Sequence, residues 1–354
     1  MERNTLLEVK DLRLSVNTHQ GQANILDGVN FCLREGKVTC LVGESGCGKS
    51  ITSLTIMGLQ HPLATNKQNY LQASGEILFQ GENLLTKSDK QMEALRGEQI
   101  AMVFQEPMTS LNPVLTIGEQ LSEAVRTHAP HLSETDIKQK VSTTLEKVNI
   151  SGQDRFDEYP FQLSGGMRQR IMIAMALIND PKLLIADEPT TALDVTVQAQ
   201  ILNLLKDLQT DHQSSILFIT HDLGVVAEIA DDVIVMYGGQ IVESGPVEEI
   251  FRDPQHPYLI GLLNSIPHFG EKLTRLQTIS GMVPSVIAMP EGCRFQTRCP
   301  FVTDKCTAAP IPVNHISGHV SHCWFTPLED NFDLHNLVPI CDQINKNEEL
   351  LNVI

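Results

Sequence analysis

Short apolar runs separated by turn-forming residues dominate the first 42 residues and predict strands over 6–16, 25–33 and 37–42. The third run is short and apolar and leads into a glycine-rich stretch, after which a helical pattern begins near Lys49. We therefore expect a strand, a loop and a helix to follow one another in this region.

Helical periodicity prevails in the middle of the chain. Amphipathic stretches at 117–128 and 133–148 predict two helices, and the turn-rich sequence MTSLNP precedes them. We expect residues from about 106 to 163 to form an inserted helical subdomain. An apolar helix is predicted to follow over 171–178.

Three apolar runs in the second half of the chain, at 181–189, 214–220 and 231–245, predict three further strands separated by helices. Strands that alternate with helices in this way indicate an α/β core. The fold class expected is therefore α/β with an inserted helical subdomain.

The composition changes near Gly245, which we interpret as a domain boundary. Residues 246–330 are rich in Pro and Cys and are expected to be dominated by loops, as a small Cys-containing C-terminal extension to a domain at 1–245. The tail at 331–354 has few structural signals and is expected to fray.

The net charge and the distribution of apolar residues argue against nucleic-acid-binding, membrane-spanning and secreted proteins. The formal charge of −17 argues against a general nucleic-acid binder. No apolar run approaches the roughly 18 residues of a membrane span, and charges occupy the place of a signal peptide's apolar region. The chain is thus expected in the cytoplasm, where its eight cysteines would be thiols or metal ligands.

The octet GESGCGKS, from Gly43 to Ser50, fits the G-x-x-x-x-G-K-[ST] pattern of a phosphate-binding loop. In such a loop, backbone N–H groups and the N-terminus of the next helix face the phosphates. Lys49 is expected to contact the β- and γ-phosphates, and Ser50 to bind Mg²⁺. Cys47 would lie beside the phosphates, and we expect it to be sensitive to alkylation.

Two carboxylates end the apolar run LLIADE. We expect Asp187 to hold Mg²⁺ through water and Glu188 to act as the base that activates the attacking water, because hydrolysis needs a polarised water in line with the breaking bond. His221 follows another apolar run and is expected to contact the γ-phosphate or orient Glu188.

The sequence LSGGMRQR, at 163–170, matches the signature of ATP-binding-cassette (ABC) transporter subunits, and the chain resembles that family over 1–245. Ser164, Gly165 and Gly166 open a helix and would offer a hydroxyl and N–H groups to a phosphate. The resemblance implies that this phosphate belongs to ATP held by a second subunit. It also implies a P-loop NTPase fold of the ABC ATPase type.

The resemblance assigns further roles. Gln105 would be the loop glutamine that contacts Mg²⁺, residues 192–194 the D-loop, and His221 the switch histidine. The catalytic residues expected are Lys49, Glu188 and His221. The other residues expected around Mg-ATP are Gly43, Glu44, Ser45, Gly46, Cys47, Gly48, Ser50, Ile51, Gln105, Ser164, Gly165, Gly166 and Asp187.

One position departs from the family's pattern. The family usually has an aromatic residue after the first strand that stacks on adenine, and the corresponding stretch LSVNTHQG offers only Val16 and His19. Weaker stacking on the base is the expected consequence.

Four cysteines cluster near the C-terminus, and Cys293, Cys299, Cys306 and Cys323 have the spacing C-x5-C-x6-C-x16-C. Four thiolates suit a [4Fe–4S] cluster or a tetrahedral Zn²⁺, and the spacing alone does not choose between them. His322 keeps a mixed ligand set open, and four unligated thiols are a further alternative. The cysteines Cys32, Cys40 and Cys341 are interpreted as ordinary buried or surface residues.

From His256 to Cys323 the chain resembles the C-terminal extension of oligopeptide and dipeptide importer ATPases, which implies the [4Fe–4S] cluster. The function implied is that of the ATPase subunit of a bacterial peptide importer, at the cytoplasmic face of the inner membrane. Its partners would be a second, paralogous ATPase subunit, two membrane subunits and an extracytoplasmic substrate-binding protein.

Other functions remain open at this stage. A soluble ABC ATPase of DNA repair would carry a long coiled-coil insertion, one of translation would carry two cassettes, and one of iron–sulfur assembly would leave the extension unexplained. In another alternative, the extension is a redox sensor of the transporter. The transported substrate is not determined by this chain, so nickel chelates and haem remain alternatives to peptides.

Overall fold

The computed structural model describes residues 5–18, 21–60, 71–105, 110–151, 155–191, 193–212, 214–266, 278–308, 310–316, 318–328 and 330–331. The predictions for His19, Ala192 and Cys341, and for the tail from residue 332, lie outside these residues. The chain forms two compact units. Unit 1 comprises Met1–Leu7, Leu33–Val38 and Phe79–Ile219, and unit 2 comprises Glu8–Cys32, Thr39–Leu78 and Thr220–Ile354.

Parallel strands form the centre of unit 1. β7 (Leu183–Asp187) pairs in parallel with β6 (Ile100–Val103) on one side and with β8 (Ser215–Thr220) on the other. Every residue of β7 and β8 is buried, as expected of parallel strands that are covered on both faces. Two of the predicted strands are thereby confirmed.

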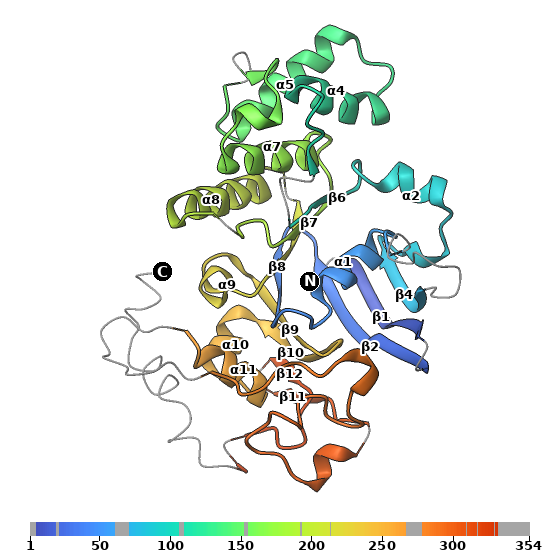
Figure 1. Ribbon diagram of the computed structural model, residues 1–354, viewed down its shortest axis with the longest axis vertical. Helices are drawn as coiled ribbons and strands as arrows, with labels where there is room; N and C mark the ends of the chain where they lie inside the picture. Colours follow the sequence, from blue (N-terminus) through green and yellow to red (C-terminus); the bar gives the residue numbers. More distant parts are fainter. Residues whose placement is uncertain are drawn as a thin grey trace. The chain divides into compact units, whose positions relative to one another are not determined.

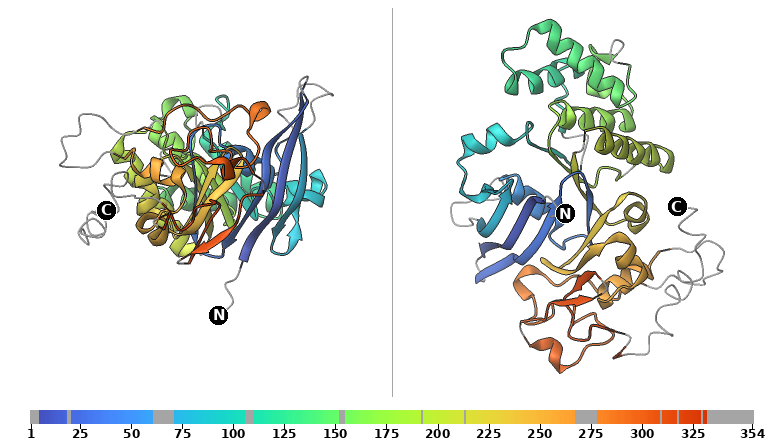
Figure 2. Two further views of the ribbon diagram at one scale, coloured as in Figure 1. Left: turned by 90° about the horizontal axis from the view of Figure 1, so that it is seen from below. Right: turned by 180° about the vertical axis from the view of Figure 1, so that it is seen from behind.

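Helices make up most of the remainder of unit 1. α4 (Ile117–His128) and α5 (Glu134–Lys147) pack against each other and against α7 (Gly165–Leu177), as the green segments of Figures 1 and 2 show. Thr116 caps α4 in a reciprocal capping box with Glu119, which explains why the helix begins where the sequence predicts. The unit's other regular elements are α2 (Asp89–Leu95), α8 (Val195–His212) and the short β5 (Glu82–Asn83).

Unit 2 contains a mixed sheet in which β3 (Val38–Val42) lies parallel to β9 (Asp232–Tyr237). β10 (Gln240–Pro246) pairs antiparallel with β9, and β12 (His319–Ser321) pairs with β10 and with β11 (Asn314–Ile316). The single strand expected over 231–245 was wrong. The chain turns back at Gly238 and Gly239, whose φ values of 55° and 80° suit a tight hairpin.

A second sheet, with most of its residues in unit 2, has the order β2 (Gly21–Arg34), β1 (Thr5–Thr18), β4 (Leu71–Phe79). The helices of unit 2 are α1 (Lys49–Ile56), α9 (Leu223–Ile229), α10 (Val247–Arg252) and α11 (Pro257–Leu263). Short 3₁₀ turns occur in the chain at Leu84–Thr86, Pro160–Gln162, Val286–Ala288 and Asp304–Thr307.

The C-terminal extension has more structure than the expected loops. The carboxylate of Glu243 in β10 is fully buried, accepts hydrogen bonds from the backbone N–H groups of Gln255 and His256, and lies 3.2 Å from Nε2 of His319. These contacts anchor two parts of the chain to β10, namely the segment that precedes α11 and the strand β12. The domain limits at 245 and 330 remain a prediction, and Gly245 lies within unit 2.

Within the described part of the chain, no helix combines the length and the apolar character that crossing a bilayer requires.

Candidate nucleotide site

The predicted phosphate loop connects β3 to α1, and α1 begins at Lys49. The loop needs glycine at two positions for different reasons. A Cβ on Gly43 would lie 2.3 Å from the carbonyl oxygen of Met236, so only glycine lets the loop approach β9 this closely. Gly46 has a φ of 82° and open space around it, which leaves its backbone accessible to a ligand. The expected order of strand, loop and helix is confirmed.

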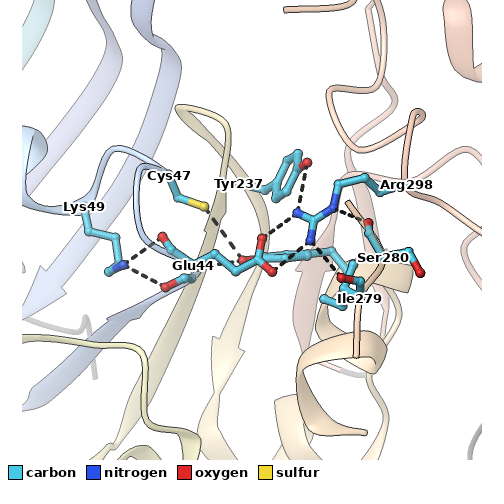
Figure 3. Close-up of polar contacts among 9 residues, drawn as sticks. Glu44, Cys47, Lys49, Tyr237, Ile279, Ser280 and Arg298 are labelled. Atoms are coloured by element: carbon cyan, nitrogen blue, oxygen red, sulfur yellow. Dashed lines mark hydrogen bonds and ion pairs between the residues drawn. The ribbon is translucent and has the colours of Figure 1, made fainter. Parts of the chain in front are cut away.

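Lys49 is buried, and its ammonium group lies against the loop itself. Nζ donates hydrogen bonds to the carbonyl oxygens of Gly43, at 2.7 Å, and Glu44, at 3.0 Å (Figure 3). Ser50 and Ile51 follow in the first turn of α1 and are half-buried. The loop therefore carries a positive charge beside open backbone, as phosphate binding requires.

Two side chains of the loop face away from the expected ligand. The carboxylate of Glu44 forms a bidentate ion pair with Arg298 of the extension. The thiol of Cys47 is 1% exposed and lies 3.8 Å from the hydroxyl oxygen of Tyr258, and burial raises its pKa. The burial and the raised pKa of Cys47 argue against the expected sensitivity to alkylation, because a buried thiol of raised pKa is a poor nucleophile.

The two carboxylates lie at the end of β7. Asp187 is its last residue and is 4% exposed. Glu188 has a left-handed φ of 46°, and its backbone N–H donates to the carbonyl oxygen of Ile219 in β8. Its carboxylate accepts hydrogen bonds from Nε2 of Gln105, at 3.1 Å, and from the hydroxyl of Thr191, at 2.9 Å. The structure thus brings the expected base and the loop glutamine together.

Thr191 was missed by the sequence analysis. Its place three residues after Glu188 is a detectable signal, because a threonine hydroxyl at that spacing can reach back to the carboxylate in a turn. His221 follows β8 and is exposed, and Asp222 after it caps α9 by accepting from the N–H of Gly224. The phosphate loop and His221 belong to unit 2, whereas Gln105, Asp187 and Glu188 belong to unit 1.

The signature sequence forms the start of α7 in unit 1. Ser164 is the N-cap, and its hydroxyl accepts from the N–H of Met167. Ser164 and Gly165 are exposed. A Cβ on Gly166 would lie 2.8 Å from Val197 in α8, so this glycine allows the two helices to approach. The exposed N-terminus of a 13-residue helix is suited to bind an anion.

The four clustered cysteines line a single pocket in unit 2. Its remaining lining residues are His256, Pro257, Phe295, Phe301, Ile311, His322, Trp324 and Phe325. Burial raises the pKa of Cys299 and of Cys323 to about 12. Among the described residues, the buried indole Nε1–H of Trp324 has no hydrogen-bond partner. Across the described residues, no three His, Cys, Asp or Glu side chains are arranged to hold one metal ion.

Two further residues predicted from the sequence, Val16 and Asp194, lie in β1 and just before α8. Val16, proposed as an apolar contact for adenine, is half-buried in β1. Asp194, the last residue of the expected D-loop, is exposed and accepts a hydrogen bond from the N–H of Val197 at the start of α8.

Comparison with protein families finds two matches. Residues 26–191 match the ABC transporter family, and residues 242–306 match the oligopeptide/dipeptide transporter C-terminal region. The first match spans the phosphate loop, the signature and both carboxylates. The second includes Cys293, Cys299 and Cys306.

Curated relatives are similar over nearly their whole length. The chain is 48% identical over 322 residues to the oligopeptide transport ATP-binding protein AppD of Bacillus subtilis, covering 90% of this chain and 96% of the relative. It is 46% identical over 328 residues to the oligopeptide transport ATP-binding protein OppD of Salmonella typhimurium, covering 92% of this chain and 95% of that protein.

Solved structures of ATP-binding cassettes share the fold. CbiO1 of Clostridium perfringens, part of an ABC transporter complex, matches with a TM-score of 0.58 and 30% identity, over 70% of this chain and 91% of that chain. A dimeric cassette in a post-hydrolysis state with ADP and Pi matches with a TM-score of 0.58 and 25% identity, over 68% of this chain and 98% of that chain. The chain therefore belongs to the ABC transporter ATP-binding proteins, in the group with the oligopeptide/dipeptide transporter C-terminal region.

Proposed function

We propose that this protein is the ATP-hydrolysing subunit of a bacterial ABC importer for peptides. The observation that carries the proposal is the similarity of 46–48% identity to oligopeptide transport ATP-binding proteins over 95–96% of their length. The match of residues 242–306 to the oligopeptide/dipeptide transporter region supports the same substrate class. Peptides, rather than nickel chelates or haem, are therefore the cargo we propose.

The chemistry proposed is the hydrolysis of Mg-ATP. Lys49 is already positioned on the phosphate loop, where its charge would bind the β- and γ-phosphates. Glu188 would accept a proton from the attacking water, and Gln105 and Thr191 hold its carboxylate in place. His221 would contact the γ-phosphate.

The residues present fit Mg²⁺ by the chemistry of their donors. The hydroxyl of Ser50, the carboxylate of Asp187 and the amide oxygen of Gln105 are the hard oxygen ligands that this ion prefers. Bound Mg²⁺ would neutralise the charge that develops on the phosphates. Gln105 donates to Glu188 through Nε2, so Oε1 is the atom that would face the cation.

A second ATPase subunit is part of the proposal. Ser164 and Gly165 are exposed at the N-terminus of α7, where they would bind the γ-phosphate of ATP held by that subunit. We propose a paralogous chain as this subunit, together with two membrane permeases and an extracytoplasmic substrate-binding protein. The ATPase would then lie at the cytoplasmic face of the membrane as a peripheral subunit.

The test is reconstitution. The chain should co-purify with two membrane permease proteins, and liposomes with the complex should take up labelled peptides in the presence of ATP and the binding protein. Uptake of a nickel chelate or haem without uptake of peptides would overturn the substrate class. Failure to associate with any membrane protein would overturn the transport function.

We further propose that Cys293, Cys299, Cys306 and Cys323 hold a [4Fe–4S] cluster. Support comes from the convergence of four thiols on one pocket and from the unpartnered Trp324 Nε1–H, which would donate to sulfur. A single zinc ion would require the sulfurs to lie about 2.3 Å from one point, whereas a cluster binds each thiolate at a different iron. The cluster would supply a cross-link between distant parts of the extension.

Anaerobic purification tests the cluster. The full-length protein should be brown and contain about four irons per chain. Cys299→Ser should remove the colour and increase proteolysis of the extension, whereas the control Cys32→Ser should keep the iron. One zinc per chain in a colourless preparation would replace the cluster with a zinc site, and metal-free protein would contradict both.

A further inference from the structure

Glu44 of the phosphate loop is tied to the C-terminal extension by Arg298, 254 residues later in the sequence. The guanidinium group donates from Nη1 to Oε2 of Glu44, at 2.5 Å, and from Nη2 to Oε1, at 3.0 Å (Figure 3). The Arg298 side chain is 4% exposed and that of Glu44 is 30% exposed. A bidentate pair of this kind fixes geometry as well as charge.

Arg298 is itself held in one position by the extension. Its Nε donates to the carbonyl oxygen of Ser280, and Nη2 donates to that of Ile279. Nη1 lies 3.4 Å from the hydroxyl oxygen of Tyr237, and the guanidinium lies near the rings of Tyr237 and Phe295. Because these contacts already hold the Arg298 side chain in one rotamer, pairing with Glu44 costs little further side-chain entropy.

A second contact from the extension holds the backbone of the same residue. The N–H of Glu44 donates to the hydroxyl oxygen of Tyr258 in α11, at 2.7 Å. Tyr258 is fully buried and packs edge-on against Tyr237, with ring centroids 4.7 Å apart. The extension thus contacts both the side chain and the main chain of one phosphate-loop residue.

The negative charge of Glu44 makes its ion pair with Arg298 relevant to nucleotide binding. Glu44 is the second residue of the loop, and its carbonyl oxygen accepts a hydrogen bond from the Lys49 ammonium group. An unpaired carboxylate at this position would repel the phosphates of ATP and compete for Lys49. Arg298 neutralises that carboxylate through the bidentate ion pair.

We propose that Arg298 is a positioning residue for ATP binding, which acts by neutralising Glu44 and holding the phosphate loop ready for the nucleotide. The proposal deepens the proposed function, because it rests on the assignment of Gly43–Ser50 as the phosphate loop. It makes the extension a part of the nucleotide site.

The test is the affinity of the full-length protein for the ATP analogue AMP-PNP with Mg²⁺, measured by calorimetry. Arg298→Met should weaken binding ~5- to 150-fold, the range typical of coupled sites, and Arg298→Lys should weaken it less. The loss should be larger for AMP-PNP than for ADP, because repulsion grows with phosphate charge. In the Glu44→Gln background, Arg298→Met should change the affinity less than ~3-fold, since no carboxylate remains to be neutralised.

Arg294→Met is the matched control. Arg294 is also a buried arginine of the extension, but its partners are Asp27, at 2.7 Å, and the carbonyl oxygen of Gly238. Its loss should lower the melting temperature but change the AMP-PNP affinity less than ~3-fold. Thermal unfolding of every variant separates loss of fold from loss of binding.

Two outcomes would overturn the proposal, and the Lys49→Ala variant shows whether the phosphate-loop assignment fails with it. Wild-type affinity of a folded Arg298→Met protein would do so, as would an equal loss of affinity in the Glu44→Gln background. If Lys49→Ala also binds AMP-PNP normally, the phosphate-loop assignment fails together with the proposal. If Lys49→Ala loses binding and Arg298→Met does not, the nucleotide site stands and only the role of Arg298 is refuted.

Discussion

Gln105 donates a hydrogen bond from Nε2 to Oε2 of Glu188 across 83 residues of sequence, at 3.1 Å. The bond joins the end of β6 to the end of β7, two parallel neighbours, so it follows directly from their register. It links the glutamine proposed to bind Mg²⁺ to the residue proposed to activate water. A substitution of Gln105 would therefore remove a direct contact of the Glu188 carboxylate.

Glu188→Gln should slow ATP hydrolysis while retaining nucleotide binding. The amide keeps the shape of the side chain but cannot accept the proton from water, and general bases contribute ~10²–10⁴-fold to rate. Phosphate release by the complex with its partner subunits measures the effect, and calorimetry measures binding. Wild-type turnover in this variant would remove Glu188 from the role of base.

Thr191→Val should lower kcat roughly 10-fold with little change in the KM for ATP, because a hydrogen bond to a charged group contributes about 1.5–3 kcal/mol. The substitution removes the 2.9 Å bond that orients the Glu188 carboxylate. Thr191→Ser keeps the hydroxyl and is the matched control, expected to restore the rate. Equal rates for the Val and Ser variants would show that the bond does not matter for hydrolysis.

Lys49→Ala should weaken the binding of Mg-ATP as well as its hydrolysis. A charge-assisted contact with phosphate is lost, and its contribution corresponds to ~10- to 150-fold in affinity. Calorimetry on the full-length chain measures the change. Unaltered affinity would contradict the role proposed for Lys49.

Ser164→Arg should impair the site of the partner subunit and spare that of its own chain. The exposed N-terminus of α7 would carry a bulky side chain where the partner's γ-phosphate is proposed to bind. Introduced into this chain alone, the substitution should reduce ATP-dependent association of the two subunits. Loss of ATP affinity by the isolated chain would contradict a composite site.

Cys47 should react with iodoacetamide at least ~10-fold more slowly than Cys32 at pH 8. Cys32 is exposed, whereas burial covers Cys47 and raises its pKa, so less thiolate is present at a given pH. The rate at Cys47 should continue to rise above the pH at which the rate at Cys32 levels off. Mass spectrometry of tryptic peptides measures both, and equal rates would show that the loop opens readily.

The sequence by itself determined the features that depend on neighbouring residues. The strand, loop and helix around Lys49 and the amphipathic helices at 117–128 and 133–148 were predicted because periodicity and caps act within a few residues. The pair Asp187 and Glu188 was predicted for the same reason, since an apolar strand places the polar residues after it at the sheet edge. The hairpin at Gly238 and Gly239 was also encoded locally, by a glycine pair, and was misread as one strand.

Only the tertiary structure decided which distant residues meet. The pairs Glu44 with Arg298 and Glu243 with His319 join the core to the extension, and no local pattern predicts either contact. The extension was expected to be dominated by loops, yet the ring centroid of Phe295 lies 5.2 Å from that of Tyr237 and 5.4 Å from that of Tyr258. Such contacts join residues that are far apart in the sequence, so they depend on the path of the whole chain and on side-chain packing. The periodicity of apolar residues within a short segment does not predict them.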